Sequence, residues 1–252
     1  MSPIIEFDAN KAKGTTYSGL YSYSAQPWWM PTGVGKSDII AAYQFVNADS
    51  EAKALTNLVD SATLQLYKLN SPTWSKSAGF SIPADPQAGL NNDSIGLYST
   101  VAIRFSDVDL TTNNIVGLVG SNELTWLIAK GYQFTSQSNC TYYKVPSYST
   151  YPFNSDTTMY KTNAGYTSGV FIYIPRYQTH NSSLYANGNL QSATSYSSGW
   201  TDYFYRVTIG QTYRKYLTNP AFGTINIQAV AFYNTELTVE QIQELTDQMA
   251  NL

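Results

Sequence analysis

The sequence FGTINIQAVAFYNTELTVEQIQEL (residues 222–245) contains, in direct succession, a strand pattern, a turn and the start of a helix. In its first half apolar residues recur at every second position, which is the period of a β-strand. This alternation predicts that Ile225, Ile227, Ala229 and Ala231 lie on one side of a strand. A strand that buries one face needs a second layer to pack against.

The second half of this stretch begins a helix with a complete start signal. Thr238 can cap the first turn, and Gln241 stands three residues later, as in a capping box. Glu240 lies in the first turn, where a negative charge interacts favourably with the helix dipole. One apolar stripe follows the predicted helix: Val239, Ile242, Leu245, Met249 and Leu252. Because so short a helix is marginal alone, we predict that the stripe packs on the preceding sheet.

Strand patterns separated by turn signals dominate the rest of the chain. In the run 99–108, Val101, Ile103 and Phe105 share one face. Residues 48–60 are the main candidate for a further short helix, and residues 136–168 are polar, aromatic and aperiodic, which predicts a long loop. The other predicted strands are the runs 4–9, 41–46, 62–69, 115–120, 124–134, 169–177, 203–210 and 223–233.

The domain organisation follows from the absence of any internal repeat or linker between these runs. We expect residues 36–252 to form one domain, with residues 1–35 an N-terminal arm and first strand that belong to the same fold. A chain of 252 residues can bury a substantial core, and all-β sandwiches of this length often form one domain.

The composition limits the classes of partner. Charged residues make up 12% of the chain, about half the usual share, and the net charge is −3 with no basic cluster, so nucleic-acid binding is not expected. Tyr occurs 22 times, which suits β-sheets and surfaces that meet sugars or proteins. No export signal or membrane span is recognisable, so we expect no membrane insertion. Cys140 is the single cysteine, which excludes an intrachain disulfide.

Several short patterns, taken in order along the chain, resemble the laminin-G-like members of the concanavalin A-like lectin/glucanase superfamily. The closing pattern is Gly223, Ile225 and AFYNTELTVEQI, and SPTWSKSAGFSI (71–82) resembles the Trp-bearing stretch that precedes a strand. SLYANGNLQSAT (183–194) resembles a hairpin in which Asn187-Gly188 supplies a turn with positive φ, and YRVTIG (205–210) resembles the next strand. The resemblance covers residues 40–252 and implies an all-β jelly-roll sandwich of two antiparallel sheets, with the short C-terminal helix packed on it.

The glucanase chemistry of that superfamily is not matched. Its Glu-x-Asp-x-x-Glu pattern is approached only by EFDANK (6–11), where Glu6 and Asp8 fit but Lys11 replaces the second glutamate. TGVGKSD (32–38) lacks the first glycine of a phosphate-binding loop, because that position holds Met30. His180 stands in a turn-like segment without a nucleophile-elbow sequence. We therefore expect no enzyme, with a polysaccharide-active glycoside hydrolase as the alternative; Glu123, Asp202 and Asp107 are then the acidic candidates.

No cofactor is expected, but calcium is a possible ligand, since the superfamily often uses it to shape a binding loop. Asp107, Asp109, Thr111 and Asn113 alternate, so that several oxygens could face one way. A polar turn after the preceding strand is the favoured interpretation.

Two aromatic stretches are the candidate ligand-binding sites. One is YSYSAQPWWMP (21–31) with Trp28 and Trp29. The other is YYKVPSYSTYPF (142–153), with Tyr142, Tyr143, Tyr148 and Tyr151. Tyr and Trp suit stacking on sugar rings or anchoring a protein interface. The alternative is that these side chains cover the ends of the sandwich or pack against another subunit.

Together these features favour a non-catalytic recognition or decoration protein on a phage particle, of the head-fibre or tail-fibre type. Its expected partners are host cell-surface glycans, other virion proteins and further copies of itself. Its expected location is then the virion, after release from the host cytoplasm by lysis. A bacterial surface lectin is a further alternative.

Overall fold

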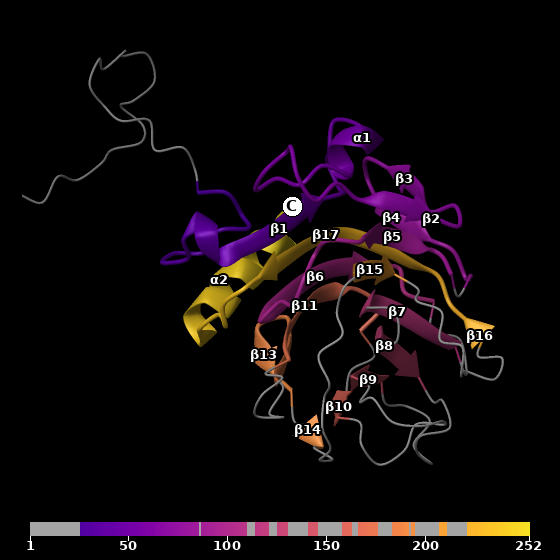
Figure 1. Ribbon diagram of the computed structural model, residues 1–252. Helices are drawn as coiled ribbons and strands as arrows, with labels where there is room; N and C mark the ends of the chain where they lie inside the picture. The colour runs from indigo at the N-terminus through magenta and orange to yellow at the C-terminus, as the bar shows by residue number, and fades with distance from the viewer. Residues whose placement is uncertain are drawn as a thin grey trace, which may run out of the picture.

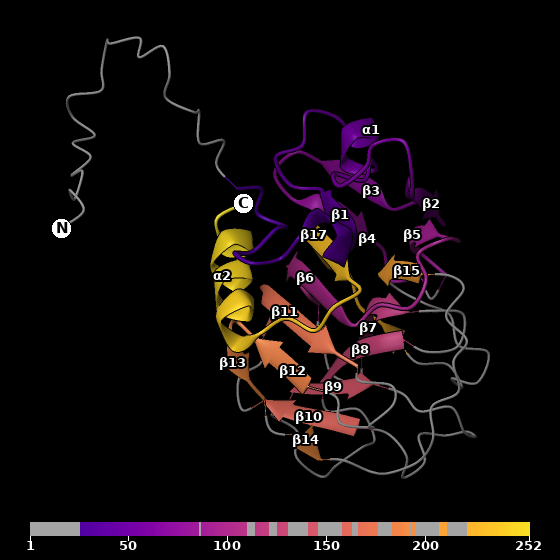
Figure 2. The same ribbon diagram turned by 60° about the vertical axis from the view of Figure 1, so that its left-hand side comes forward.

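A computed structural model describes residues 26–85, 87–109, 114–120, 125–130, 141–145, 158–162, 166–175, 183–191, 193–194, 207–210 and 221–252. Two antiparallel sheets face each other and enclose a core, and one long helix lies on the outer side of the first sheet (Figure 1, Figure 2). This is the all-β, two-sheet sandwich with a packed C-terminal helix that the sequence predicts.

Sheet A contains the first strand and the last strand of the part of the chain that the structure describes. Its order is β13 (Asn189–Leu190), β12 (Ser183–Ala186), β11 (Gly169–Ile174), β6 (Thr100–Ser106), β17 (Ile225–Tyr233), β4 (Gly79–Ile82) and β3 (Thr73–Ser75), with β1 (Ile39–Gln44) also paired to β17. The long strand β17 is therefore central, with β6 along one side and β4 and β1 sharing the other.

Sheet B is built mostly from the middle of the chain. Its order is β14 (Ala193–Thr194), β10 (Thr158–Thr162), β9 (Thr141–Val145), β8 (Thr125–Lys130), β7 (Asn114–Gly120), β15 (Val207–Gly210), β5 (Gly89–Asn92) and β2 (Tyr67–Leu69), with β16 (Ala221–Phe222) parallel to β7. The described helices are the single turns η1 (Lys36–Asp38) and α1 (Glu51–Ala54) and the longer α2 (Val239–Ala250). None of these helices is long and apolar enough to cross a membrane.

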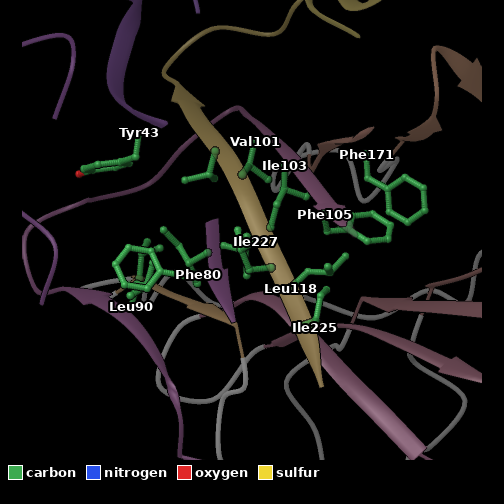
Figure 3. Close-up of a cluster of buried hydrophobic side chains, with 14 of the residues drawn as sticks. Tyr43, Phe80, Leu90, Val101, Ile103, Phe105, Leu118, Phe171, Ile225 and Ile227 are labelled. Carbon is green, nitrogen blue, oxygen red and sulfur yellow. The ribbon is translucent and has the colours of Figure 1, made fainter. Parts of the chain in front are cut away.

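The core between the sheets is made by alternate side chains of strands from both layers, as Figure 3 shows. Val101, Ile103 and Phe105 of β6 all point into it and are at most 1% exposed, as their alternation predicts. Phe105 meets Phe171 of β11 edge to face, with ring centroids 4.7 Å apart. Such pairs add stability beyond the area that they bury.

The predicted common face of Ile225, Ile227, Ala229 and Ala231 is wrong, because β17 is interrupted by a bulge. The register shifts between Ile227 and Ala229, where the carbonyl of Gln228 accepts hydrogen bonds from Phe45 N (2.8 Å) and Val46 N (3.0 Å). One extra residue exchanges the two faces of a strand. Ile225 and Ile227 therefore lie in the core with Val230 and Phe232, whereas Ala229 and Ala231 face outward toward α2.

The helix α2 begins where the sequence predicts. Thr238 Oγ1 accepts from Gln241 N, and Gln241 Oε1 accepts from Thr238 N, which completes the capping box. Ile242, Leu245 and Met249 are fully buried, and Leu252 packs against the same cluster. Val239 does not belong to the buried stripe: as the first helical residue it is 60% exposed, so the stripe begins one turn later.

Two further expectations need correction. The run 62–69 forms a strand only over Tyr67–Leu69, because Leu64 adopts a φ of 52° that breaks the extended backbone. The predicted loop 136–168 contains β9 and β10, so Tyr142 and Tyr143 belong to a strand.

Two local predictions are confirmed. Residues 48–60 contain the one-turn helix α1. Asn187 and Gly188 form the β12–β13 turn with φ of 49° and 77°.

Candidate functional site

The outer face of sheet A is closed by an apolar layer. Small and branched residues of β1, β6, β11 and β17 form its floor, and Ile242, Leu245 and Met249 of α2 pack on that floor. Figure 2 shows α2 lying lengthwise outside this sheet. Because these helix residues are fully buried, this part of sheet A offers no surface to a ligand.

Residues 26–34, which we call the N-terminal strap, cover a second part of this face. Trp28, Trp29 and Met30 are half-buried and pack against the same outer cluster, and Val34 is buried in it. Trp28 Nε1 donates to Gln44 Oε1 (3.0 Å), while the carbonyl of Trp29 accepts from the hydroxyl of Tyr233 (3.0 Å). The two predicted ligand-binding tryptophans are thus part of the cover of sheet A, and their role in binding stays a prediction.

The strap is tied to α2 by one glutamate and one glutamine. Glu244 accepts hydrogen bonds from Thr32 N (2.9 Å) and Thr32 Oγ1 (3.2 Å). Gln241 Nε2 donates to the carbonyl of Thr32 (3.1 Å). Every polar group of Thr32 is thereby engaged by the helix, which holds the strap over the outer cluster.

Sheet B carries a polar network on the face that points away from the core. Leu90 of β5 and Val207 and Ile209 of β15 face the core, so their neighbours Asn91 and Thr208 face outward. The register places Tyr67, Asn91 and Thr208 directly opposite one another on three adjacent strands. Three facing polar side chains in one row can form a continuous hydrogen-bond network.

The network is centred on the amide of Asn91. Asn91 Oδ1 accepts from Thr208 Oγ1 (2.8 Å), and Asn91 Nδ2 donates to Asp93 Oδ1 (3.1 Å) and to the hydroxyl of Tyr67. That hydroxyl donates in turn to Asp93 Oδ2 (2.8 Å). We call these four residues, Tyr67, Asn91, Asp93 and Thr208, the Tyr67 network.

Two members of the Tyr67 network are buried and two are exposed to solvent. Asn91 is fully buried and Thr208 is 4% exposed, so both need internal partners, which the network supplies. Tyr67 remains 39% exposed and Asp93 is exposed. The accessible pair is therefore an aromatic ring beside a carboxylate, both anchored from below.

The predicted tyrosines occupy another part of sheet B. Tyr142 and Tyr143 lie in β9, paired with Ala129 and Ile128 of β8, and four strand spacings separate β9 from β5. Tyr148 and Tyr151 lie outside the described residues. The structure therefore does not bring Tyr142 and Tyr143 together with Trp28 and Trp29, which lie on sheet A.

Of the four residues predicted as possible calcium ligands, Asp107 and Asp109 lie in the part of the chain that the structure describes. Asp107 has a φ of 52°, and its Oδ2 accepts from Ser106 Oγ (2.9 Å) and Asn226 Nδ2 (2.7 Å). Asp109 donates its backbone N–H to the carbonyl of Thr224 (2.9 Å). Within the described part of the chain, no three His, Cys, Asp or Glu residues gather as a metal site. The other proposed ligands, Thr111 and Asn113, lie outside that part.

The residues weighed for catalysis lie largely outside the described ranges. These are Glu6, Asp8, Lys11, Glu123, His180 and Asp202. Lys36 of the TGVGKSD segment stands in the single turn η1, directly before β1.

Sequence reasoning missed the Tyr67 network. Its members come from three separate segments, and NNDSIG (91–96) taken alone favours a turn over an ion site. A usable signal was the polar Asn91 directly after the apolar Leu90, because strand alternation then places an amide on the outward face.

No family model and no curated protein sequence matches the chain. Solved structures do match its fold. A Trypanosoma rangeli sialidase in complex with 2,3-difluorosialic acid has a TM-score of 0.58 at 11% identity, covering 88% of this chain and 35% of the sialidase. A structure of botulinum neurotoxin type C, a toxin whose cell entry is dependent upon interaction with two ganglioside molecules, has a TM-score of 0.56 at 10% identity, covering 85% of this chain and 52% of that one.

A third match is the binding domain of botulinum neurotoxin DC in complex with rat synaptotagmin II, with a TM-score of 0.54 at 11% identity, covering 85% of this chain and 52% of that one. The chain thus spans about a third to a half of the proteins that it resembles. At these identities the similarity shows a shared β-sandwich fold.

Proposed function

We propose that this chain is a non-catalytic recognition protein that binds glycans of a host cell surface and is displayed on a phage particle. The observation that carries the binding part is the contrast between the two sheets. The helix α2 and the N-terminal strap cover the apolar outer cluster of sheet A, whereas sheet B presents an anchored tyrosine and a carboxylate. Recognition is therefore assigned to the side of sheet B.

Two further observations support a recognition role. The matched structures include a sialidase in complex with 2,3-difluorosialic acid, a toxin whose cell entry is dependent upon interaction with two ganglioside molecules, and a toxin binding domain in complex with rat synaptotagmin II. The low share of charged residues and the abundance of Tyr agree with a surface that meets sugars or proteins.

The display on a particle is proposed from the surface-type composition of the chain, in which charged residues make up 12% and Tyr occurs 22 times. In this proposal other virion proteins and further copies of the chain are its structural partners. Mass spectrometry of purified phage particles and of uninfected bacteria tests this part. The protein is expected in the particles, and its detection only in uninfected bacteria would overturn the assignment to a virion.

Binding is tested with the purified full chain on a glycan array and on intact bacterial cells, each with and without EDTA. Saturable binding without release of sugar is the expected result. Loss of binding in EDTA would show that binding needs a divalent cation, with the Asp107–Asp109 loop as the candidate site. Release of sugar would overturn the non-catalytic role in favour of a glycoside hydrolase, and absence of binding to every glycan and cell would overturn the recognition role.

A further inference from the structure

We infer that the outer face of sheet A beyond the end of α2 is a contact surface between two copies of this chain, in which Arg104 of each copy pairs with Asp107 of the other. This inference rests on the part of the proposed function that names further copies of the chain as partners. It deepens that part by assigning the surface and its charged contacts.

The helix α2 leaves one end of this outer face uncovered. Just before the helix, Leu237 N donates to Thr100 Oγ1 at the start of β6 (3.3 Å). Just after the helix, the main-chain oxygen of Leu252 accepts from Arg104 Nη1 (2.8 Å). The helix therefore follows β6 only as far as Arg104, and the outer face beyond that residue is not covered by α2.

Short uncharged side chains form the floor of this uncovered end. Their strand neighbours face the core, so these side chains point outward. The register places four of them directly opposite one another on adjacent strands: Thr73 of β3, Ser81 of β4, Asn226 of β17 and Ser106 of β6. A row without long side chains is flat, so another protein surface can approach it closely.

Arg104 supplies a positive charge at the edge of this floor. Among the strands that the structure describes in sheet A, it is the only residue with a charged side chain. It is half-buried, and burial lowers the pKa of its guanidinium below the usual value. A guanidinium has five N–H donors, and no carboxylate of the described residues lies within ion-pair distance of this one. Arg104 therefore keeps donors for an anion from outside.

Asp107 supplies the opposite charge on the same face. Its Oδ2 accepts from Ser106 Oγ (2.9 Å) and from Asn226 Nδ2 (2.7 Å), which are both outward-facing groups. These two bonds hold the carboxylate over the outer face, where Asp107 is exposed. Within one chain Asp107 and Arg104 form no ion pair, so both charges remain for a partner.

The two charges make the surface complementary to itself. When two copies meet face to face, a two-fold axis in the interface that crosses midway between Arg104 and Asp107 brings each guanidinium onto the carboxylate of the other copy. Two ion pairs form at once, and such charge pairs fix the register of an interface. The same axis reverses β6, so the two α2 helices lie on opposite sides of it. A second copy thus supplies both of the charges that the surface requires.

The experiment measures self-association of the full chain by sedimentation velocity and by size-exclusion chromatography with light scattering. The wild type should form dimers that added salt weakens. Arg104→Asp and Asp107→Arg should each weaken association at least about a hundredfold, because each places like charges opposite one another twice. An equimolar mixture of the two variants should form dimers again, because every charge then meets an opposite one.

Asp49→Arg and Lys53→Asp are the matched controls, since they make the same charge changes at exposed positions around α1. Neither should change self-association. Thermal unfolding followed by circular dichroism shows whether each variant is folded. If Arg104→Asp does not fold, Arg104→Gln, which keeps a donor for Leu252, takes its place. Asp107→Arg should then associate with Arg104→Gln more strongly than with itself.

The outcomes separate this inference from the recognition role. A wild-type chain that binds glycans but stays monomeric at every concentration would overturn the inference and leave recognition intact. Dimers that persist in both charge variants, or a mixture of the variants that stays monomeric, would also overturn it. Loss of glycan binding in folded Arg104→Asp would assign this face to an anionic ligand instead. Dimers that respond as expected while no glycan and no cell is bound would support the inference and overturn recognition.

Discussion

At the scale of single residues, Gln241 shows why an amide is needed at the third position of α2. Its Oε1 accepts from Thr238 N (2.9 Å), as a glutamate could, but its Nε2 also donates to the carbonyl of Thr32 (3.1 Å). Only a side chain that both accepts and donates can cap the helix and hold the N-terminal strap at once.

Gln241→Glu tests this double role. The capping box is retained, but the hydrogen bond to Thr32 is lost and a second carboxylate is placed near Glu244, which also binds Thr32. We expect unfolding to become easier by about 1–2 kcal/mol and the backbone amides of the strap to exchange faster with deuterium. Urea denaturation and hydrogen exchange measure the two effects.

A matched control for this variant is Gln87→Glu. Gln87 is exposed, and its Oε1 only accepts, from Asn70 Nδ2 (3.3 Å), so a carboxylate can take its place. Equal hydrogen exchange of the strap in Gln241→Glu and wild type would show that Gln241 does not hold it.

At the scale of secondary-structure elements, the bulge of β17 depends on its neighbour β4. Gly79, the first residue of β4, has a φ of 78°, and a Cβ placed there would lie 2.3 Å from the carbonyl oxygen of Ile227. A larger residue would thus meet backbone rather than a movable side chain. The backbone at the bulge of β17 therefore requires a glycine at position 79 of β4.

Gly79→Ala should therefore lower the free energy of unfolding by at least about 2 kcal/mol, from the strained φ and the clash together. Gly96→Ala is the comparison, because no atom lies within 4 Å of a Cβ at that position. That change should be neutral or stabilise by up to about 1 kcal/mol, through the unfolded state. Thermal and urea denaturation compare the two variants, and equal stabilities would contradict the argument.

The same elements show how far the sequence predicts the structure. The capping box of α2 and the Asn187-Gly188 turn were predictable because their partners lie within a few residues. The bulge was not, because the groups that bind Gln228 belong to residues 45–46 at the other end of the chain. The Tyr67 network likewise depends on the pairing of three strands that no local pattern specifies. Aromatic composition instead indicated Trp28 and Trp29, which cover sheet A.

At the scale of the whole molecule, three layers are held together by two apolar clusters, and each cluster contains a buried tyrosine. Tyr43 lies in the core between the sheets and donates to the carbonyl of Leu64. Tyr233 lies in the outer cluster and donates to the carbonyl of Trp29 (3.0 Å). Burial raises the pKa of both phenols above the usual value of 10.0.

These pKa shifts predict that the sandwich loses stability in alkali. In the unfolded chain both tyrosines release a proton near pH 10, whereas in the folded state they stay protonated to higher pH. The stability is complete below pH 10 and falls as the pH rises, by about 1.4 kcal/mol per pH unit for each phenol. Urea denaturation between pH 8 and pH 11, a range set around the phenol pKa, measures the slope.

Tyr43→Phe and Tyr233→Phe should each reduce the loss of stability above pH 10 by about 1.4 kcal/mol per pH unit, because each removes one phenol that ionises on unfolding. This reduction is expected whatever the effect of the substitution on stability at neutral pH. Phe80→Leu, a change at a fully buried core residue without a phenol, should lower stability at every pH and leave the slope unchanged. An unaltered slope in both phenylalanine variants would contradict the argument. Faster exchange of the strap in Tyr233→Phe at neutral pH would show that this hydroxyl, which donates to the carbonyl of Trp29, holds the strap on the outer cluster.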